Sequence, residues 1–162
     1  MANPKSTKAI NSGKVLVNLD KISSSAHIVS VELTEDIRNG SVVKLGDYQG
    51  QDFYKGVKPA VLADDRIAFV AASILPYDLK VNVEDVVLKA GERVRAYVLQ
   101  RGDIITLSND AIEGATAVGK FVVPAVGSYQ VAASDAKVEG LNFVVIAKER
   151  LHGLDATVLE VI

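Results

Sequence analysis

Two pairs of adjacent acidic residues are the clearest candidates for chemistry in this chain. Asp64-Asp65 and Glu84-Asp85 offer the oxygen ligands that hard cations prefer, and paired carboxyl groups also perform general acid–base catalysis. Successive side chains on a β-strand point to opposite faces, so a pair in sequence is not a pair in space. We therefore expect a turn at Asp64-Asp65 and a solvated strand edge at Glu84-Asp85. The enzyme alternative is a small β-barrel hydrolase or lyase, which needs two of these carboxyl groups in one pocket with a raised proton affinity.

The other chemistry-bearing residues predict no catalytic, metal or cofactor site. His27 and His152 lie in unlike contexts, and neither has a histidine or carboxylate at ligand spacing. Arg101-Gly102-Asp103 spells a tripeptide that some adhesion receptors read, but it is typical of a hairpin turn in which the glycine takes a positive backbone angle. The chain has no cysteine, no nucleophile elbow and no glycine-rich phosphate loop. We expect a protein that is not an enzyme and that uses no cofactor.

Composition narrows the classes of partner. With 18 Lys and Arg against 20 Asp and Glu, the net charge of −2 at pH 7 predicts no nonspecific binding to nucleic acid. No apolar stretch approaches the roughly 20 residues needed to span a bilayer, and the first residues have no hydrophobic signal core. We therefore expect a soluble protein, made in the cytoplasm, with no membrane partner.

Short runs of Val, Ile and Leu bounded by turn-forming residues make up most of the chain. The elements that these runs form must position the acidic pairs, the histidines and the Arg-Gly-Asp segment. Residues 40–47, 102–108 and 118–124 show the pattern, and β-branched runs of this kind favour strands. The chain is therefore predicted to be all-β, built from small barrel or sandwich units. The expected strands are residues 15–19, 27–33, 41–45, 53–55, 60–63, 67–71, 81–89, 93–99, 103–107, 118–123, 128–132, 141–147 and 156–162. A single helical turn is the alternative for 81–89.

The same pattern suggests a division of the chain into two lobes. Pro76 cannot donate to a sheet ladder and disfavours helical geometry at the residue before it. We expect a first β lobe over 14–75, an irregular connection over 76–92 and a second β lobe over 93–162.

Residues 1–13 are small and polar, without apolar periodicity, and predict a flexible N-terminal arm. The simpler interpretation is a frayed terminus. The functional interpretation is an arm that becomes ordered on a partner, in which Lys5, Lys8 and, at the junction with the body, Lys14 meet an acidic surface.

Several phrases, read in order, resemble one family. They are Asp20-Lys-Ile-Ser-Ser-Ser-Ala-His-Ile-Val-Ser30, Asn39-Gly-Ser-Val-Val-Lys-Leu-Gly46, Tyr54-Lys-Gly-Val-Lys-Pro59, Ala90-Gly-Glu-Arg-Val-Arg-Ala-Tyr-Val-Leu99, Arg101-Gly-Asp-Ile-Ile-Thr106 and Val118-Gly-Lys-Phe-Val-Val-Pro124. Together they are similar to the capsid decoration, or cement, proteins of tailed bacteriophages, over nearly the whole chain beyond the arm. The resemblance implies a β-rich structural protein, made in the host cytoplasm, on the outer surface of the virion capsid. It also implies the major capsid protein as partner, bound at junctions between subunits, with the decoration protein attached as a monomer or as a trimer of its own copies. No residue of the arm matches a family motif.

Two other functions stay open. One is a different phage structural component, such as a tail or fibre subunit, and the other is a small ligand-binding β module. Because the chain has no Trp and only five Tyr, it lacks an obvious aromatic platform for sugars, but loops can also bind ligands through hydrogen bonds.

Overall fold

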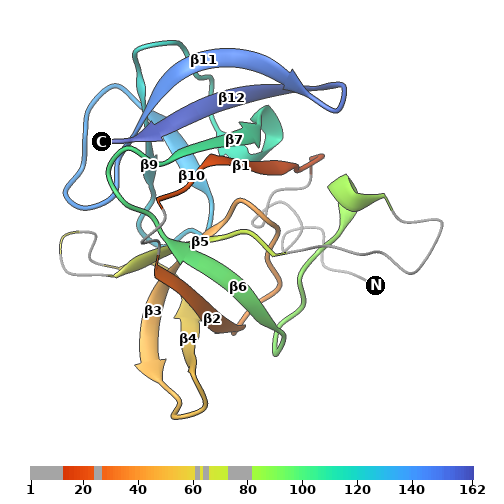
Figure 1. The fold of residues 1–162 in the computed structure, drawn as a ribbon, viewed down its shortest axis with the longest axis vertical. Helices are drawn as coiled ribbons and strands as arrows, with labels where there is room; N and C mark the ends of the chain where they lie inside the picture. Colours follow the sequence, from red (N-terminus) through yellow and green to blue (C-terminus); the bar gives the residue numbers. More distant parts are fainter. Residues whose placement is uncertain (1–12, 24–26, 61–62, 64–65, 73–81) are drawn as a thin grey trace.

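A computed structural model describes residues 13–23, 27–60, 63, 66–72 and 82–162. These residues form twelve β-strands and two single-turn 3-10 helices, so the prediction of an all-β fold is confirmed. Five strands close a barrel and seven form a second sheet, which lie at opposite ends of the molecule in Figure 1. No helix in this part of the chain has the length and apolar character needed to cross a membrane.

The barrel closes in the strand order β2-β4-β3-β5-β6. Its strands are β2 (His27–Leu33), β3 (Val42–Tyr48), β4 (Phe53–Val57), β5 (Ile67–Val70) and β6 (Arg93–Val98). β2 and β4 run parallel, and the other neighbours run antiparallel. Closure leaves these strands no open edge. Small and β-branched side chains fill the interior, including Val31, Val43, Ala68, Val70 and Ala96.

The second sheet has the order β1-β7-β12-β11-β9-β10-β8. Its strands are β1 (Val17–Lys21), β7 (Ile104–Ser108), β8 (Ile112–Glu113), β9 (Phe121–Pro124), β10 (Val131–Ser134), β11 (Phe143–Leu151) and β12 (Leu154–Val161). β8 and β10 are parallel, whereas the other neighbouring strands are antiparallel. The 3-10 helix η2 (Asn109–Ala111) links β7 to β8.

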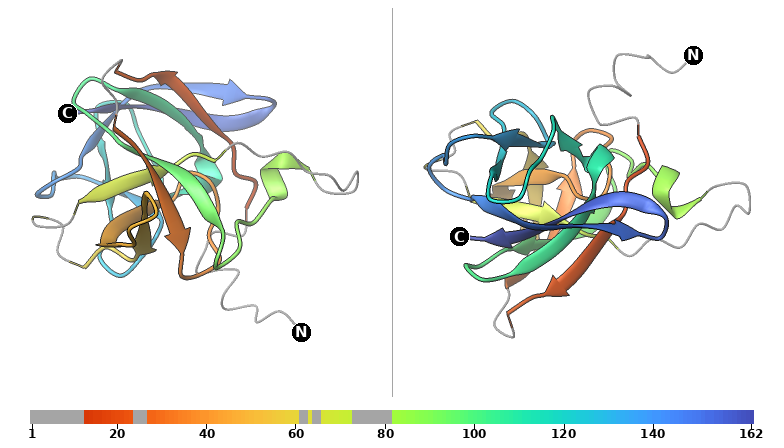
Figure 2. Two further views of the ribbon diagram at one scale, coloured as in Figure 1. Left: turned by 60° about the horizontal axis from the view of Figure 1, so that its bottom comes forward. Right: turned by 90° about the horizontal axis from the view of Figure 1, so that it is seen from above.

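One hydrophobic core joins the barrel to the sheet. Phe69, on the barrel, and Phe143, on the sheet, are both fully buried in this core. The cluster also includes Val42 and Ile67 of the barrel and Ile105, Leu107 and Leu159 of the sheet. Figure 2 shows the two units stacked in two further views. The units therefore bury apolar surface against each other and cannot separate without exposing both aromatic side chains.

The turn that begins β3 shows why the chain needs glycine at position 40. Gly40 has a φ of 80°, as the predicted Asn39-Gly40 turn requires, and a Cβ there would lie 3.0 Å from a methyl carbon of Leu107. The Asn39 side chain donates to the backbone carbonyl of Ala72 and accepts from its N–H, both at 2.9 Å. This side chain thus completes the backbone hydrogen bonding where β5 ends.

The two sheets do not coincide with the predicted lobes. β1, from the predicted first lobe, pairs with β7 of the second sheet, and β6, from the predicted second lobe, closes the barrel between β5 and β2. The segment Arg101-Gly102-Asp103 therefore crosses from one sheet to the other, so the predicted hairpin is wrong, although Gly102 has the predicted positive φ, at 94°. Local periodicity identifies strands, but long-range contacts decide which strands pair.

Two shorter predictions also differ from the structure. Residues 83–85 form the 3-10 helix η1 (Val83–Asp85), and Leu88 makes one isolated bridge with Ile37, so the single-turn alternative replaces the predicted strand over this stretch. Ala60 and Ala63 lie outside any strand, and residues 61–62 and 76–81 lie outside the described residues.

Candidate interaction surfaces

Hydrogen bonds and one ion pair fix the first described residues of the chain to the body. The backbone N–H of Lys14 donates to Asp110 Oδ2 at 3.0 Å, and its Nζ lies 3.1 Å from Asp85 Oδ1. The N–H of Val15 donates to the backbone carbonyl of Glu84 at 2.9 Å. The structure thus places Lys14 on acidic residues of its own chain, whereas Lys5 and Lys8 lie outside the described residues. We call residues 13–15 together with Arg38, Glu84, Asp85 and Asp110 the arm root.

Arg38 is the buried centre of the arm root. Its side chain is 5% exposed and donates from Nη1 to the carbonyl of Gly13 and from Nη2 to the carbonyl of Glu84. Burial lowers the pKa of Arg38, against the opposing effect of Asp85 and Asp110. Sequence reasoning missed this residue because it stands just before the Asn39-Gly40 turn, where an arginine is ordinarily exposed.

Asp85 is held ionised within the arm root. Its hydrogen bond with Lys14 lowers the pKa of Asp85, and the Asn82 amide, 3.5 Å away, acts in the same direction. The carboxyl group therefore lacks the raised proton affinity that the enzyme alternative requires at this residue. Glu84 and Asp85 lie on η1 and not on a strand edge, which corrects the prediction for this pair. Asp64 and Asp65 lie outside the described residues.

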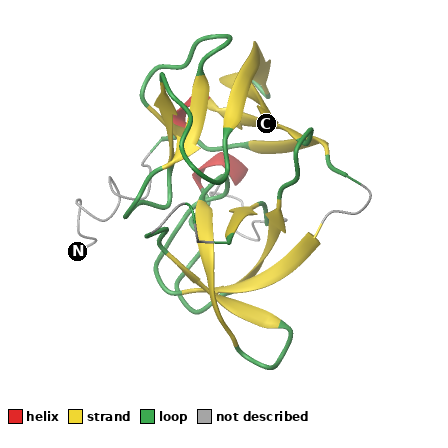
Figure 3. Cartoon of the chain, turned by 90° about the vertical axis from the view of Figure 1, so that its left-hand side faces the viewer, coloured by secondary structure: helices red, strands yellow, loops and turns green. Residues whose placement is uncertain are grey.

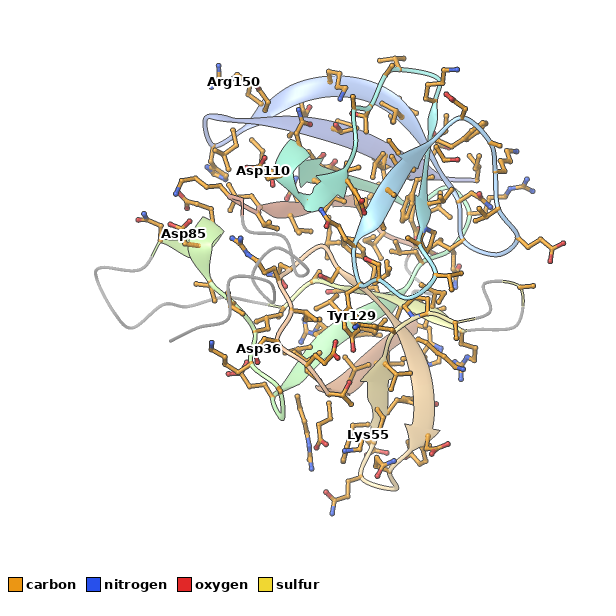
Figure 4. All side chains as sticks on the ribbon, turned by 180° about the vertical axis from the view of Figure 1, so that it is seen from behind. Asp36, Lys55, Asp85, Asp110, Tyr129 and Arg150 are labelled. Atoms are coloured by element: carbon orange, nitrogen blue, oxygen red, sulfur yellow. The ribbon has the colours of Figure 1, made fainter. Side chains whose placement is uncertain are left out.

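A polar groove of about 440 Å³ adjoins the arm root. It is lined by Lys14, Ser108, Asn109, Asp110, Arg150, Gly153, Leu154 and Asp155. Figure 4 shows Asp85, Asp110 and Arg150 along the same side of the molecule. The Arg150 Nε lies 4.0 Å from Asp155 Oδ1, with both side chains at least 70% exposed, so this ion pair contributes little to stability. Two basic and two acidic side chains line the groove, so it has no preference for ligands of one charge.

A second candidate surface lies at the far end of the barrel, where β3 turns into β4. We call residues 47–52 the hairpin tip. The Tyr48 side chain is 54% exposed, and its ring lies 5.2 Å from that of Tyr54 at an interplanar angle of 57°. Its hydroxyl donates to Asp52 Oδ1 at 2.8 Å, a bond that raises the pKa of Tyr48. Gly50 and Asp52 both have a positive φ, 68° and 60°, so the turn is tight.

Cationic side chains support the base of this hairpin. The Arg93 guanidinium lies 3.8 Å from the centre of the Phe53 ring, and its Nε is 3.7 Å from Glu32. Arg66 lies 5.6 Å from the Tyr54 ring. Lys55, labelled in Figure 4, bonds to Glu32 and lowers the pKa of that carboxyl group. Cation–π contacts and ion pairs together hold the hairpin on the barrel.

The remaining predicted positions stay apart from both surfaces. Asp103 is 3% exposed, and its two carboxylate oxygens accept from the N–H groups of Ser23 and Gln100, each at 2.9 Å. Its carboxylate is therefore occupied inside the fold. His27 begins β2 and is exposed, and His152 forms the turn between β11 and β12 with a φ of 49°. Over the described ranges, no group of three or more His, Cys, Asp and Glu side chains is placed to hold a metal ion.

Comparison of the chain with models of protein families, with curated proteins and with solved structures found no match.

Proposed function

We propose that this protein binds the outside of an assembled tailed-phage capsid and stabilises the shell by bridging major capsid subunits. It acts as a structural protein at the virion surface, without catalysis. The proposal rests on the strand-and-turn phrases that resemble capsid decoration proteins, and its observational support in the structure is the arm root.

The arm root fixes the point at which residues 1–12 are attached to the body. Gly13, Lys14 and Val15 are each bonded to the body, through Arg38, Asp110 and Glu84. A polar segment attached to a rigid point can extend across a neighbouring subunit without disturbing the fold that carries it. Such a segment adds contact area beyond that of the body.

Bridging would stabilise the shell by mass action. A protein that binds the assembled lattice but not its dissociated subunits shifts the equilibrium toward the lattice. When the arm and the body contact different subunits, the second contact forms at a high effective concentration, so the two together bind far more tightly than either alone.

The test is co-sedimentation with mature heads that lack this protein, followed by counting copies per particle. We expect saturable binding at a copy number commensurate with the capsid lattice. Deletion of residues 1–12, which leaves the Gly13 carbonyl for Arg38, should reduce the affinity about tenfold or more without shifting the unfolding midpoint.

The double variant Lys5→Ala/Lys8→Ala keeps the length of the arm and removes its two charges, so it separates charge from contact area. Absence of wild-type binding to heads would contradict the proposed function. Rings of six copies in native mass spectrometry would instead favour the tail-component alternative.

A further inference from the structure

We infer that the hairpin tip, residues 47–52, is a rigid knob that enters a hollow in the major capsid protein, one with an apolar floor and a basic rim. This inference rests on the proposed function and adds the element that makes the contact and the chemistry of the surface that receives it.

The shape of the hairpin favours a protein partner over a small ligand. The β3–β4 hairpin projects from the end of the barrel, at the bottom of both Figure 1 and Figure 3. Small molecules bind in concave sites that enclose most of their surface. A projecting element with an exposed aromatic ring is instead suited to a hollow in another protein.

The knob is already ordered in the unbound protein. Tyr48 is fixed on one side by the ring of Tyr54 and at its hydroxyl by Asp52. The N–H of Gln49 donates to the carbonyl of Phe53 at 2.9 Å, and its side-chain amide donates to the carbonyl of Asp47 at 3.0 Å. Little side-chain entropy remains to be lost on binding, and tyrosine is among the residues enriched at interface hot spots. Tyr48 is therefore the anchor of the contact.

The charge of the knob specifies the rim of its receptor. Residues 47–52 read Asp-Tyr-Gln-Gly-Gln-Asp, with two carboxylates and no basic side chain. Two cations approach the base of the tip: Arg66 lies 5.6 Å from the Tyr54 ring, and Arg93 lies 3.8 Å from the Phe53 ring. Arg93 also donates from Nη2 to Gln51 Oε1 at 3.3 Å, whereas Asp47 and Asp52 carry the two carboxylates of the tip. An acidic knob is steered toward a basic rim and away from an acidic one.

The experiment measures binding of Tyr48→Ala to mature heads that lack this protein, beside the wild type. We expect the affinity to fall at least tenfold, because a central aromatic anchor is lost. Tyr48→Phe keeps the ring and should stay within about threefold of the wild type. Val126→Ala, at a 63% exposed position in the turn between β9 and β10, is the matched control and should bind normally. Circular dichroism checks that each variant is folded.

Each outcome is decisive. If the wild type binds heads and Tyr48→Ala binds equally well, the inferred role of the hairpin tip is overturned while the proposed function stands. If the wild type does not bind heads, both fail. A third outcome concerns self-association, measured by analytical ultracentrifugation. If the wild type self-associates and Tyr48→Ala does not, while both bind heads equally well, the receptor is a second copy of this chain, which overturns the assigned partner.

The basic rim is tested by Asp47→Asn, a change at an exposed position of the tip. We expect slower association with heads and a weaker dependence of the association rate on salt. An unchanged salt dependence would overturn the basic rim.

Discussion

The arm root and the hairpin tip are two solutions to holding a chain segment in place. At the arm root a charged side chain, Arg38, is 5% exposed and binds backbone carbonyls from two distant segments. At the hairpin tip an aromatic side chain, Tyr48, is 54% exposed and is fixed by residues of its own hairpin. The first arrangement contributes to the stability of the whole fold, whereas the second leaves apolar surface available to a partner. Three predictions test this contrast, in addition to the binding experiments above.

The largest effect is expected at Arg38. Arg38→Met should lower the free energy of unfolding by about 3 kcal/mol, because the carbonyls of Gly13 and Glu84 lose a charged donor in a buried place. Urea unfolding followed by far-ultraviolet circular dichroism measures it, since the chain has no Trp for fluorescence.

Arg150→Met is the matched control for Arg38→Met. It makes the same chemical change at a side chain that is 70% exposed, and it should stay within about 0.5 kcal/mol of the wild type. If both variants lower the free energy of unfolding equally, Arg38 stabilises the fold no more than an exposed arginine does, which contradicts its role in the arm root.

A smaller effect, dependent on pH, is expected at Asp85. Lys14 lowers the pKa of Asp85 in the folded protein, so the resulting stability is present above the ordinary carboxyl pKa of about 4. It is lost as the pH falls through the lowered folded-state pKa. Asp85→Asn should therefore lower the thermal midpoint at pH 7, and the difference from the wild type should shrink as the pH falls through the lowered folded-state pKa of Asp85.

Asp155→Asn serves as the control for Asp85→Asn, because its ion pair with Arg150 is longer, at 4.0 Å against 3.1 Å. We expect this control to change the midpoint less than Asp85→Asn at pH 7. A difference between Asp85→Asn and the wild type that persists unchanged at low pH would contradict the ion pair as its source.

The smallest effect concerns the hairpin tip. Asp52→Asn replaces the carboxylate whose hydrogen bond, and to a lesser extent whose charge, raises the pKa of Tyr48, so this pKa should fall toward the ordinary tyrosine value of about 10. An NMR titration of the Tyr48 ring carbons measures the shift. Asp47→Asn, a neighbouring change without a bond to the Tyr48 hydroxyl, should shift it less. Equal titration of Tyr48 in the wild type and in Asp52→Asn would show that the hydroxyl is not held by Asp52 in solution.

Local pattern predicted most of the strands but not their partners. The expected strand 27–33 coincides with β2 at both ends, because alternating apolar residues and a preceding serine loop are signals contained in one short window. The pairing of β1 with β7 joins residues far apart in the chain, and no feature of either strand specifies it. The two-residue β8 was missed because it is too short to show alternation.

The candidate surfaces were less predictable for the same reason. Lys14 was noticed for its charge, but its partners Asp85 and Asp110 come together only through the fold. Tyr48 and Tyr54 stand on either side of a turn, and their contact depends on the register shift between Leu45 and Tyr48 in the pairing of β3 with β4. The chain has only five tyrosines, but the β3–β4 hairpin brings two of them, Tyr48 and Tyr54, together.

The position of β12 has a consequence for how the protein is made. β12 lies between β7 and β11, and it leaves the ribosome after the other eleven described strands. The barrel strands end at Val98 and can close earlier, but the sheet cannot be completed until β12 inserts between its two neighbours. Until the sheet assembles, the side of the barrel that carries Phe69 lacks the sheet side chains that share its core. The nascent chain therefore passes through a stage with an exposed aromatic surface and an open strand edge, which is the stage most prone to aggregation.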